Sequence, residues 1–191
     1  MRRLIALELA LAMALSTTSF AAASSTDAVR WSVLRRPLHL PVVAVGSRCP
    51  VSRVDRRVSE QIRIAGAVGP GPVYPVFGTR SALLNTTKDM QFGSRWQGQK
   101  VFWYVAPSYR DRVLIRGGRL DGSGRLGFNG TRVPRDELRI EPSDTVSWSG
   151  QPRHSRGIPS AVRALSSGCY GVQVDGRTFS TVLVFQVDLA P

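Results

Sequence analysis

The sequence predicts an all-β protein that folds as an antiparallel β-sandwich from about Trp31 to its last residue. Short segments with alternating apolar and polar residues recur along the chain, and clusters of glycine and proline separate them. This pattern is typical of sandwiches. Because no segment predicts a helix long enough to connect parallel strands, the strands should pair antiparallel. We expect roughly seven to nine short strands in two packed sheets, with a small β-barrel as the alternative architecture.

The most regular stretch is Cys169–Val187, which reads CYGVQVDGRTFSTVLVFQV. Apolar residues occupy every second position on both sides of Asp175-Gly176. Since side chains alternate across a strand, this period gives one face to a core. Asp-Gly supplies the positive φ angles that a tight hairpin turn needs. The stretch therefore predicts a terminal β-hairpin that turns at Asp175-Gly176.

Other segments predict the remaining strands. VFWYVA, at residues 101–106, is apolar on both faces and predicts a central strand of the core. Further strands are expected at 73–77, 112–120, 125–128, 138–140 and 158–165. The segment Val51–Ala67 is ambiguous, because its charged residues could form a helical turn, whereas Gln61–Ala65 alternates as a strand does. We interpret it as a short strand.

The N-terminus has the features of an export signal. Two arginines follow Met1, the segment Leu4–Leu15 is apolar except for Glu8, and small residues precede position 24. We expect a signal peptide at 1–23 and a flexible leader at 24–30. The alternative is a membrane anchor, but the apolar segment is shorter than the roughly 20 residues that span a bilayer. The expected product is secreted or extracytoplasmic, with no transmembrane anchor after signal cleavage.

The two cysteines, Cys49 and Cys169, fit an oxidising compartment and predict one disulfide. It would attach the proline-containing segment Trp31–Pro50, expected to lie extended at the edge of the domain, to the terminal hairpin. The alternative is a nucleophilic thiol assisted by His39 or His154, but an exported pair of cysteines is normally bridged. The spacing of these four residues matches no zinc pattern. We expect neither a metal site nor a cofactor.

The formal net charge is +13, and Lys88 and Lys100 are the only lysines, so arginine carries nearly all of the positive charge. A strongly basic surface attracts polyanions. Outside a cell these would be anionic cell-envelope polymers, lipid headgroups or released nucleic acid. The alternative is a general coding bias toward arginine, which the even spread of the arginines along the chain favours.

Four residues are candidates for binding. The polar segment Thr79–Lys100 predicts a long loop, and such loops often carry function. Within it, Trp96 could stack on a sugar or a base, and Arg95 could hold an anionic group. The alternative for Trp96 is that its ring covers the end of the core. Arg116 and Arg119, in the strand expected at 112–120, complete the set.

No catalytic residue is assigned. The pattern Gly-x-Ser-x-Gly of serine hydrolases is absent from the sequence. The segment 69–72, GPGP, lacks the Lys-Ser or Lys-Thr of a phosphate-binding loop. An alternative function, a secreted hydrolase or carbohydrate-active protein, would need paired carboxylates. The candidates for this role are Asp121, Asp136, Glu137 and Asp144.

Several segments resemble uncharacterised exported bacterial proteins of immunoglobulin-like shape. They are Ser167-Gly168-Cys169-Tyr170 with Val174-Asp175-Gly176, the earlier GPVYP at 71–75, and LIRGGRLDG at 114–122. The resemblance implies an immunoglobulin-like β-sandwich and export from a bacterium, and it implies no activity. We expect a non-catalytic module that binds anionic cell-envelope polymers or another envelope protein, and no specific nucleic acid.

Overall fold

The structure is a computed structural model that describes residues 27–144, 148 and 150–191. The described residues belong to two compact units, 27–35 and Arg36–Pro191. In the first unit, residues 27–32 are helical, and Trp31 Nε1 donates a hydrogen bond to Asp27 Oδ1 over 3.2 Å. The predicted signal peptide, 1–23, and the first part of the predicted leader, 24–26, lie outside the described residues.

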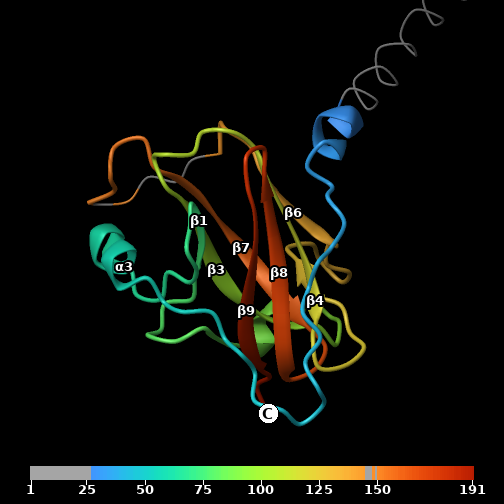
Figure 1. Ribbon diagram of the computed structural model, residues 1–191. Helices are drawn as coiled ribbons and strands as arrows, with labels where there is room; N and C mark the ends of the chain where they lie inside the picture. Colours follow the sequence, from blue (N-terminus) through green and yellow to red (C-terminus); the bar gives the residue numbers. More distant parts are fainter. Residues whose placement is uncertain (1–26, 145–147, 149) are drawn as a thin grey trace, which may run out of the picture. The chain divides into compact units, whose positions relative to one another are not determined.

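The second unit consists of two β-sheets that share one core (Figure 1). The four-stranded sheet has the order β1 (Val73–Val76), β3 (Gln97–Val105), β7 (Arg156–Ala164) and β5 (Gly127–Phe128). The five-stranded sheet has the order β2 (Leu83–Asn85), β9 (Ser180–Asp188), β8 (Gly168–Gly176), β4 (Val113–Arg119) and β6 (Glu137–Ile140). The prediction of an all-β sandwich is confirmed, and its immunoglobulin-like topology stays a prediction.

The core between the sheets follows the predicted alternation of apolar residues. Its inward residues include Val101, Trp103 and Val105 of β3 and Tyr170, Val172 and Val174 of β8. Trp103 Nε1 donates to Ser160 Oγ over 2.8 Å, so the polar atom of this buried ring has a partner. Since β1 and β7 pair with β3 on its two sides, the prediction of a central strand at 101–106 is confirmed.

Strands β8 and β9 form the predicted terminal hairpin, but its turn does not lie at Asp175-Gly176. Asp175 pairs with Ser180, and the Gly176 N–H donates to the Phe179 carbonyl over 3.0 Å, so Arg177-Thr178 make the turn. Neither Asp175 nor Gly176 has a positive φ angle. The predicted turn is wrong because the Asp175 carboxylate is buried among partners within the sheet, and these keep it in β8.

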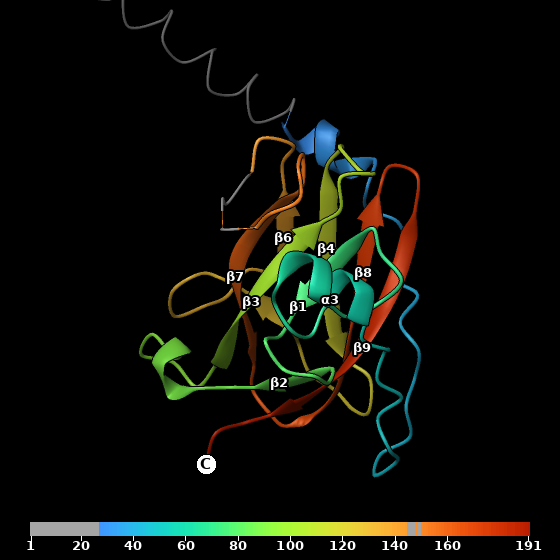
Figure 2. The ribbon, with the colours of Figure 1, turned by 90° about the vertical axis from the view of Figure 1, so that its left-hand side faces the viewer.

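A short helix covers part of the outer face of the four-stranded sheet (Figure 2). This helix, α3 (Arg56–Ile62), begins after Asp55, whose carboxylate caps it by accepting a hydrogen bond from the Val58 N–H over 3.0 Å. Ile62 is its buried residue and packs against Tyr74, Val76 and Tyr104. The prediction of a strand at 61–65 is therefore wrong, and the helical alternative holds for this segment. No helix in the described ranges is long and apolar enough to cross a membrane.

The segment Thr79–Lys100 is more ordered than the predicted loop. It contains β2, a 3-10 turn η1 (Lys88–Met90) and the first residues of β3. Strand β2 pairs parallel with β9, with Leu84 opposite Val187, whereas every other pair of strands is antiparallel among the described residues. The expectation of a wholly antiparallel sandwich is wrong at this edge. A parallel pair needs a long connection, and here most of the domain separates the two strands.

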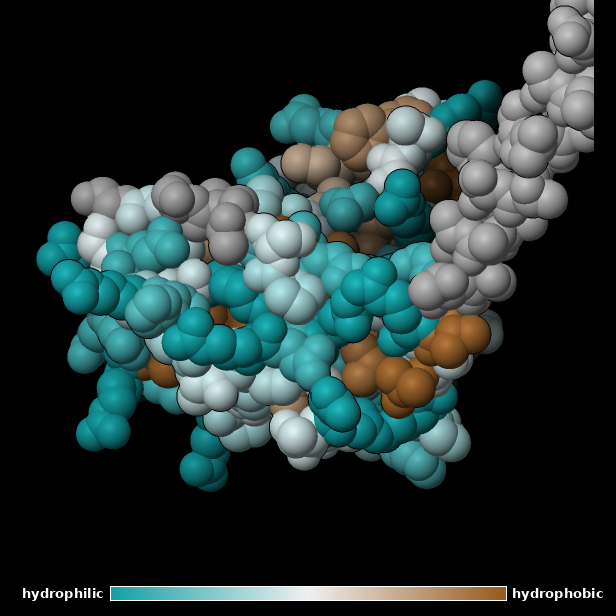
Figure 3. All heavy atoms as spheres, turned by 90° about the horizontal axis from the view of Figure 1, so that it is seen from above, coloured by the Kyte–Doolittle hydropathy of each residue, from teal (hydrophilic) through white to brown (hydrophobic). Residues whose placement is uncertain are grey.

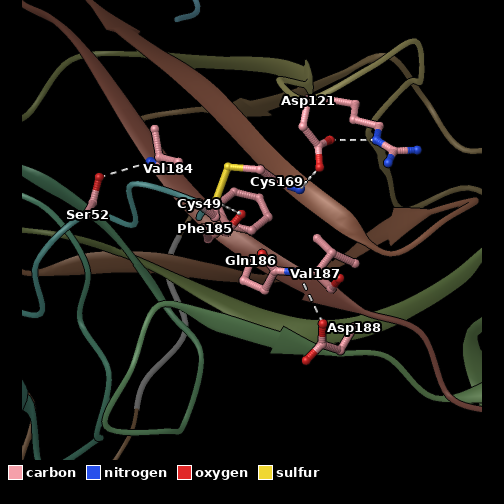
Figure 4. The surroundings of a disulfide bond; sticks show 10 residues. Cys49, Ser52, Asp121, Cys169, Val184, Phe185, Gln186, Val187 and Asp188 are labelled. Carbon is pink, nitrogen blue, oxygen red and sulfur yellow. Dashed lines mark hydrogen bonds and ion pairs between the residues drawn. A yellow bond between two sulfur atoms is a disulfide. The ribbon is translucent and has the colours of Figure 1, made fainter. Parts of the chain in front are cut away.

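Residues 36–50, which we call the strap, run without helix or strand along the outer face of the five-stranded sheet. The strap is held by a hydrogen bond from the Val43 N–H to the Leu120 carbonyl, over 2.9 Å, and by the Cys49–Cys169 disulfide (Figure 4). The disulfide is confirmed, and so is the extended course of the predicted segment from Arg36 to Pro50, whereas Trp31 and Ser32, at its predicted start, are helical. Beyond Cys49, Ser52 exchanges two hydrogen bonds with Val184 of β9.

One arginine is fully buried and joins loops to β7. Arg163 donates hydrogen bonds to the carbonyl oxygens of Asn129, Thr131 and Gln91 and to the hydroxyl of Ser94. None of these acceptors carries a charge. Burial lowers the pKa of Arg163, because desolvation disfavours the cation. The side chain therefore organises the loops at 91–94 and 129–131 from inside the domain.

Candidate functional site: a basic cavity and an aromatic groove

The C-terminal end of α3 sets the geometry of the site. Arg63, the residue after the helix, adopts the left-handed conformation with φ 57° and ψ 30°. This conformation ends the helix, and the Arg63 and Ile64 N–H groups donate to the Glu60 and Ser59 carbonyls. The chain then turns toward the four-stranded sheet.

The segment Ile64–Gly66 is bonded to the end of β1. Gly78 donates to the Ala65 carbonyl over 3.1 Å, and Phe77 donates to the Gly66 carbonyl over 3.2 Å. Gly66 has φ +83°, and a Cβ there would collide with the carbonyl oxygen of Thr79. A glycine is thus required for this close approach, which brings Arg80 to the side of α3.

A cavity of about 470 Å³ lies between α3 and this segment. Three arginines line it, Arg56, Arg63 and Arg80, together with one carboxylate, Glu60. All three arginines are exposed, and none forms an ion pair with a carboxylate among the described residues. The cavity therefore presents an excess of positive charge, which suits an anionic group.

A groove of about 380 Å³, which we call the aromatic groove, lies next to this basic cavity, and Ile64 lines both hollows. Its lining includes Phe77, Lys100, Phe102, Trp148 and Pro159. The rings of Phe102 and Trp148 meet edge to face, with centroids 5.1 Å apart and an interplanar angle of 76°. Trp148 Nε1 donates to the Ile62 carbonyl over 3.2 Å, and this bond ties the indole to the end of α3.

The groove follows from the alternation of β3. Lys100, Phe102 and Tyr104 share the outward face of this strand, and α3 covers only the part near Tyr104. Lys100 is exposed and Phe102 is half-buried, so part of the aromatic surface remains open to solvent. Hydrophilic side chains cover most of the molecular surface seen in Figure 3, as the arginine-rich composition predicts.

The structure does not bring the four predicted binding residues together. Trp96 and Arg95 precede β3; Arg95 is exposed, whereas Trp96 is half-buried and lies against Gly127 of β5. Both of the other candidates lie on β4, in the opposite sheet. Neither role predicted for Trp96, as a binding ring or as a cover for the end of the core, is tested by this position.

Internal partners occupy the two arginines of β4. Arg116 Nη2 donates to Asp175 Oδ2 over 2.8 Å and to the Arg36 carbonyl over 2.6 Å. Arg119 Nε donates to Asp121 Oδ1 over 2.7 Å, and its Nη1 donates to a serine hydroxyl. Their side chains are 16% and 24% exposed, respectively. Both arginines therefore stabilise the fold and offer little charge to a ligand.

The carboxylates considered for hydrolysis are also engaged locally. Asp121, Asp136 and Glu137 accept hydrogen bonds from Arg119, Arg125 and Arg139, and Asp144 accepts one from the Glu141 N–H. Among the described residues, none of the four lines the basic cavity or the aromatic groove. No group of three metal-ligating side chains occurs in the described part of the chain.

Comparisons with known proteins give little further information. No family model matches the chain, and no curated protein matches it. Among solved structures, the chain is similar to a "Putative Lipoprotein from Bacillus anthracis", with 10% sequence identity and a TM-score of 0.45. The similarity covers 75% of this chain and 88% of that protein.

Proposed function

We propose that this protein is an extracytoplasmic, non-catalytic β-sandwich module that binds anionic polymers of the cell envelope through the basic cavity. The observation that carries the proposal is the convergence of Arg56, Arg63 and Arg80 on one hollow without a carboxylate partner. Arginine forms two parallel hydrogen bonds with a carboxylate or phosphate, so three of them can hold such a group in a defined orientation.

The location outside the cytoplasm belongs to the same proposal. It is supported by the basic and apolar N-terminal sequence and by the Cys49–Cys169 disulfide, which persists in oxidising compartments. The resemblance to exported bacterial proteins of immunoglobulin-like shape supports it too. A net charge of +13 adds long-range attraction to polyanions, which salt weakens.

Retention of the protein on purified cell wall and on an immobilised anionic polymer, across a salt series, tests the proposal. The variant Arg56→Ser/Arg63→Ser/Arg80→Ser removes the cavity charge. The matched control, Arg57→Ser/Arg95→Ser/Arg132→Ser, removes the same charge from exposed arginines outside the cavity lining. We expect the cavity variant to lose at least about tenfold in affinity and to show a weaker salt dependence, because fewer counterions are released on binding.

Two results would contradict the proposal. If both variants lose affinity equally, binding depends on total charge and the cavity has no special part. If the unmodified protein is not retained even at low salt, it does not bind these polymers, and retention on wall fractions that keep their proteins would then indicate an envelope protein as the partner.

A further inference from the structure

The aromatic groove holds a rigid apolar platform next to the basic cavity. The Phe102 ring lies over β7, where a Cβ at Gly157 would approach the ring Cζ to 2.6 Å. Because Gly157 has no side chain, the Phe102 ring can occupy this space. Pro159, the cross-strand partner of Phe102, adds a second rigid ring to the groove.

Contacts from two directions fix the second aromatic ring. Trp148 packs edge to face on Phe102 and on Tyr104, whose ring centroid is 6.2 Å away. Its Nε1 is held by the Ile62 carbonyl. Since the two rings stand at 76° to each other, a flat apolar surface can lie on the face of one ring and against the edge of the other. Because both rings are positioned before any ligand arrives, little conformational entropy is lost in this contact.

Positive charge lies beside this platform. Lys100 lines the groove itself, and Arg63 and Arg80 line the cavity beyond Ile64. The hydrogen bond between Ala65 and Gly78 holds the intervening segment against the sheet, so the two hollows are fixed relative to each other. A ligand that occupies both must combine an apolar face with anionic groups.

We infer that the ligand is an acidic polysaccharide, in which one sugar ring packs on Phe102 and Trp148 while neighbouring anionic groups contact Lys100 and the cavity arginines. This inference rests on the proposed function and specifies the polymer. The C–H face of a sugar ring is apolar and rigid, and its hydroxyl groups can project toward Lys100 and water. Polyphosphate offers no apolar face, and an acidic peptide must lose far more conformational freedom to present one.

Binding of defined probes to the whole protein tests this inference. The probes are an acidic oligosaccharide with a carboxylate on alternate rings, its neutral analogue, polyphosphate, an oligoglutamate and a single-stranded oligothymidylate. The variant Phe102→Leu keeps the apolar volume but removes the flat ring. We expect it to weaken binding of the acidic oligosaccharide by about three- to tenfold and to leave polyphosphate binding unchanged. Arg63→Ser should weaken both.

A measurement on the unmodified protein does not depend on the folding of Phe102→Leu. Saturation transferred from aromatic protons of the protein should reach the ring C–H protons of the acidic oligosaccharide, and an excess of polyphosphate should reduce the signal. Absence of transfer to a bound oligosaccharide overturns the inference.

The two proposals fail in different ways. If none of the anionic probes binds, the proposed function fails. If polyphosphate and the oligosaccharide bind equally well and Phe102→Leu affects neither, the cavity binds anions but the inference of a sugar ring is wrong. Stronger, Phe102-dependent binding of the oligothymidylate would replace the sugar by a nucleic-acid base, since bases also stack on aromatic rings. The same result with the oligoglutamate would identify an acidic peptide instead.

Discussion

Arg116 of β4 donates a hydrogen bond over 2.8 Å to Asp175 of β8, whose carboxylate is completely buried. Four parts of the fold meet at this carboxylate. Besides Arg116, it accepts hydrogen bonds from Ser180 of β9, from Gln173 of β8 and, over 3.5 Å, from Arg36 of the strap. Arg36 also donates to the carbonyls of the hairpin turn. A buried charge needs such partners to offset its desolvation.

Replacement of Asp175 by asparagine should strongly destabilise the protein. The change keeps the shape of the side chain but leaves Arg116 and Arg36 without a negative partner, and breaking a buried pair costs about 3–5 kcal/mol. Urea denaturation measures the loss. The control is Asp136→Asn, which removes a carboxylate from an exposed pair with Arg125 and should cost less than about 1 kcal/mol. Equal effects of the two variants would show that the buried network contributes nothing special.

Removal of the disulfide should lower stability without changing the fold. The bond joins residues 120 positions apart. In the chain-entropy model, a loop of this length contributes about 4–5 kcal/mol by restricting the unfolded chain. Denaturation of Cys49→Ser/Cys169→Ser, compared with the oxidised protein, measures the difference. An unchanged midpoint would contradict the chain-entropy explanation for this bond.

Asp121 should make stability depend on pH in the acid range. Its hydrogen bond from Arg119 lowers its pKa below the ordinary value, so the folded state binds this proton less readily than the unfolded state does. The resulting stabilisation is complete well above about pH 4, the pKa of an unperturbed aspartate, and is lost as the pH falls through the lower, folded-state pKa. The difference in urea midpoint between the wild type and Asp121→Asn should therefore shrink on acidification. A difference that stays constant with pH would contradict this explanation.

Replacement of Arg163 by lysine should be disruptive although the charge is kept. Lysine is a single charged centre and cannot reach carbonyls on two loops with a planar, forked group. The four acceptors of Arg163 lie in partly exposed loops, so each lost hydrogen bond should cost about 0.5–1.5 kcal/mol. We expect a lower denaturation midpoint and faster proteolysis in the loop at 91–94. The exposed Arg95→Lys is the matched control, and similar behaviour of the two variants would count against an organising role for Arg163.

The elements that could be predicted from the sequence carry their own signal. In β8, Tyr170, Val172 and Val174 alternate with Gly171 and Gln173, and β9 is rich in apolar and β-branched residues. The apolar run in β3 is typical of a core strand. The two cysteines had one plausible partner each. Such signals depend on the hydrophobicity of individual side chains, so they can be recognised without knowing which residues lie nearby in the folded structure.

The elements that were missed depend on contacts far away in the chain. Helix α3 has seven residues and buries only Ile62, too little to produce a helical period, and Ile64 belongs to the turn that follows. The hairpin turn lies two residues beyond its predicted position because Asp175 is paired within the sheet. Its partners are Arg36 of the strap and Arg116 of β4, and their proximity cannot be seen in the sequence.

The candidate site could not be assembled from the sequence for the same reason. Arg63 and Arg80 approach each other only because the segment Ile64–Gly66 is bonded to the end of β1. The signal in the sequence was the cluster of charged residues after Asp55. A helix in this region, the alternative that we did not choose, would have placed these charges on its exposed face.

The place of β9 in the five-stranded sheet has a consequence for biogenesis. This strand, the last of the described chain, lies between β8 and β2. Directly after β2, Thr86 donates a hydrogen bond to the Asp188 carbonyl of β9, which is 102 positions away in the chain. Because synthesis proceeds from the N-terminus, β2 is made long before β9, and its backbone groups stay unpaired until β9 has been made. Sheets that depend on such distant pairings form slowly, because the entropy of closing the loop is lost before the contacts form. Completion of the five-stranded sheet should accordingly wait until β9 has been synthesised.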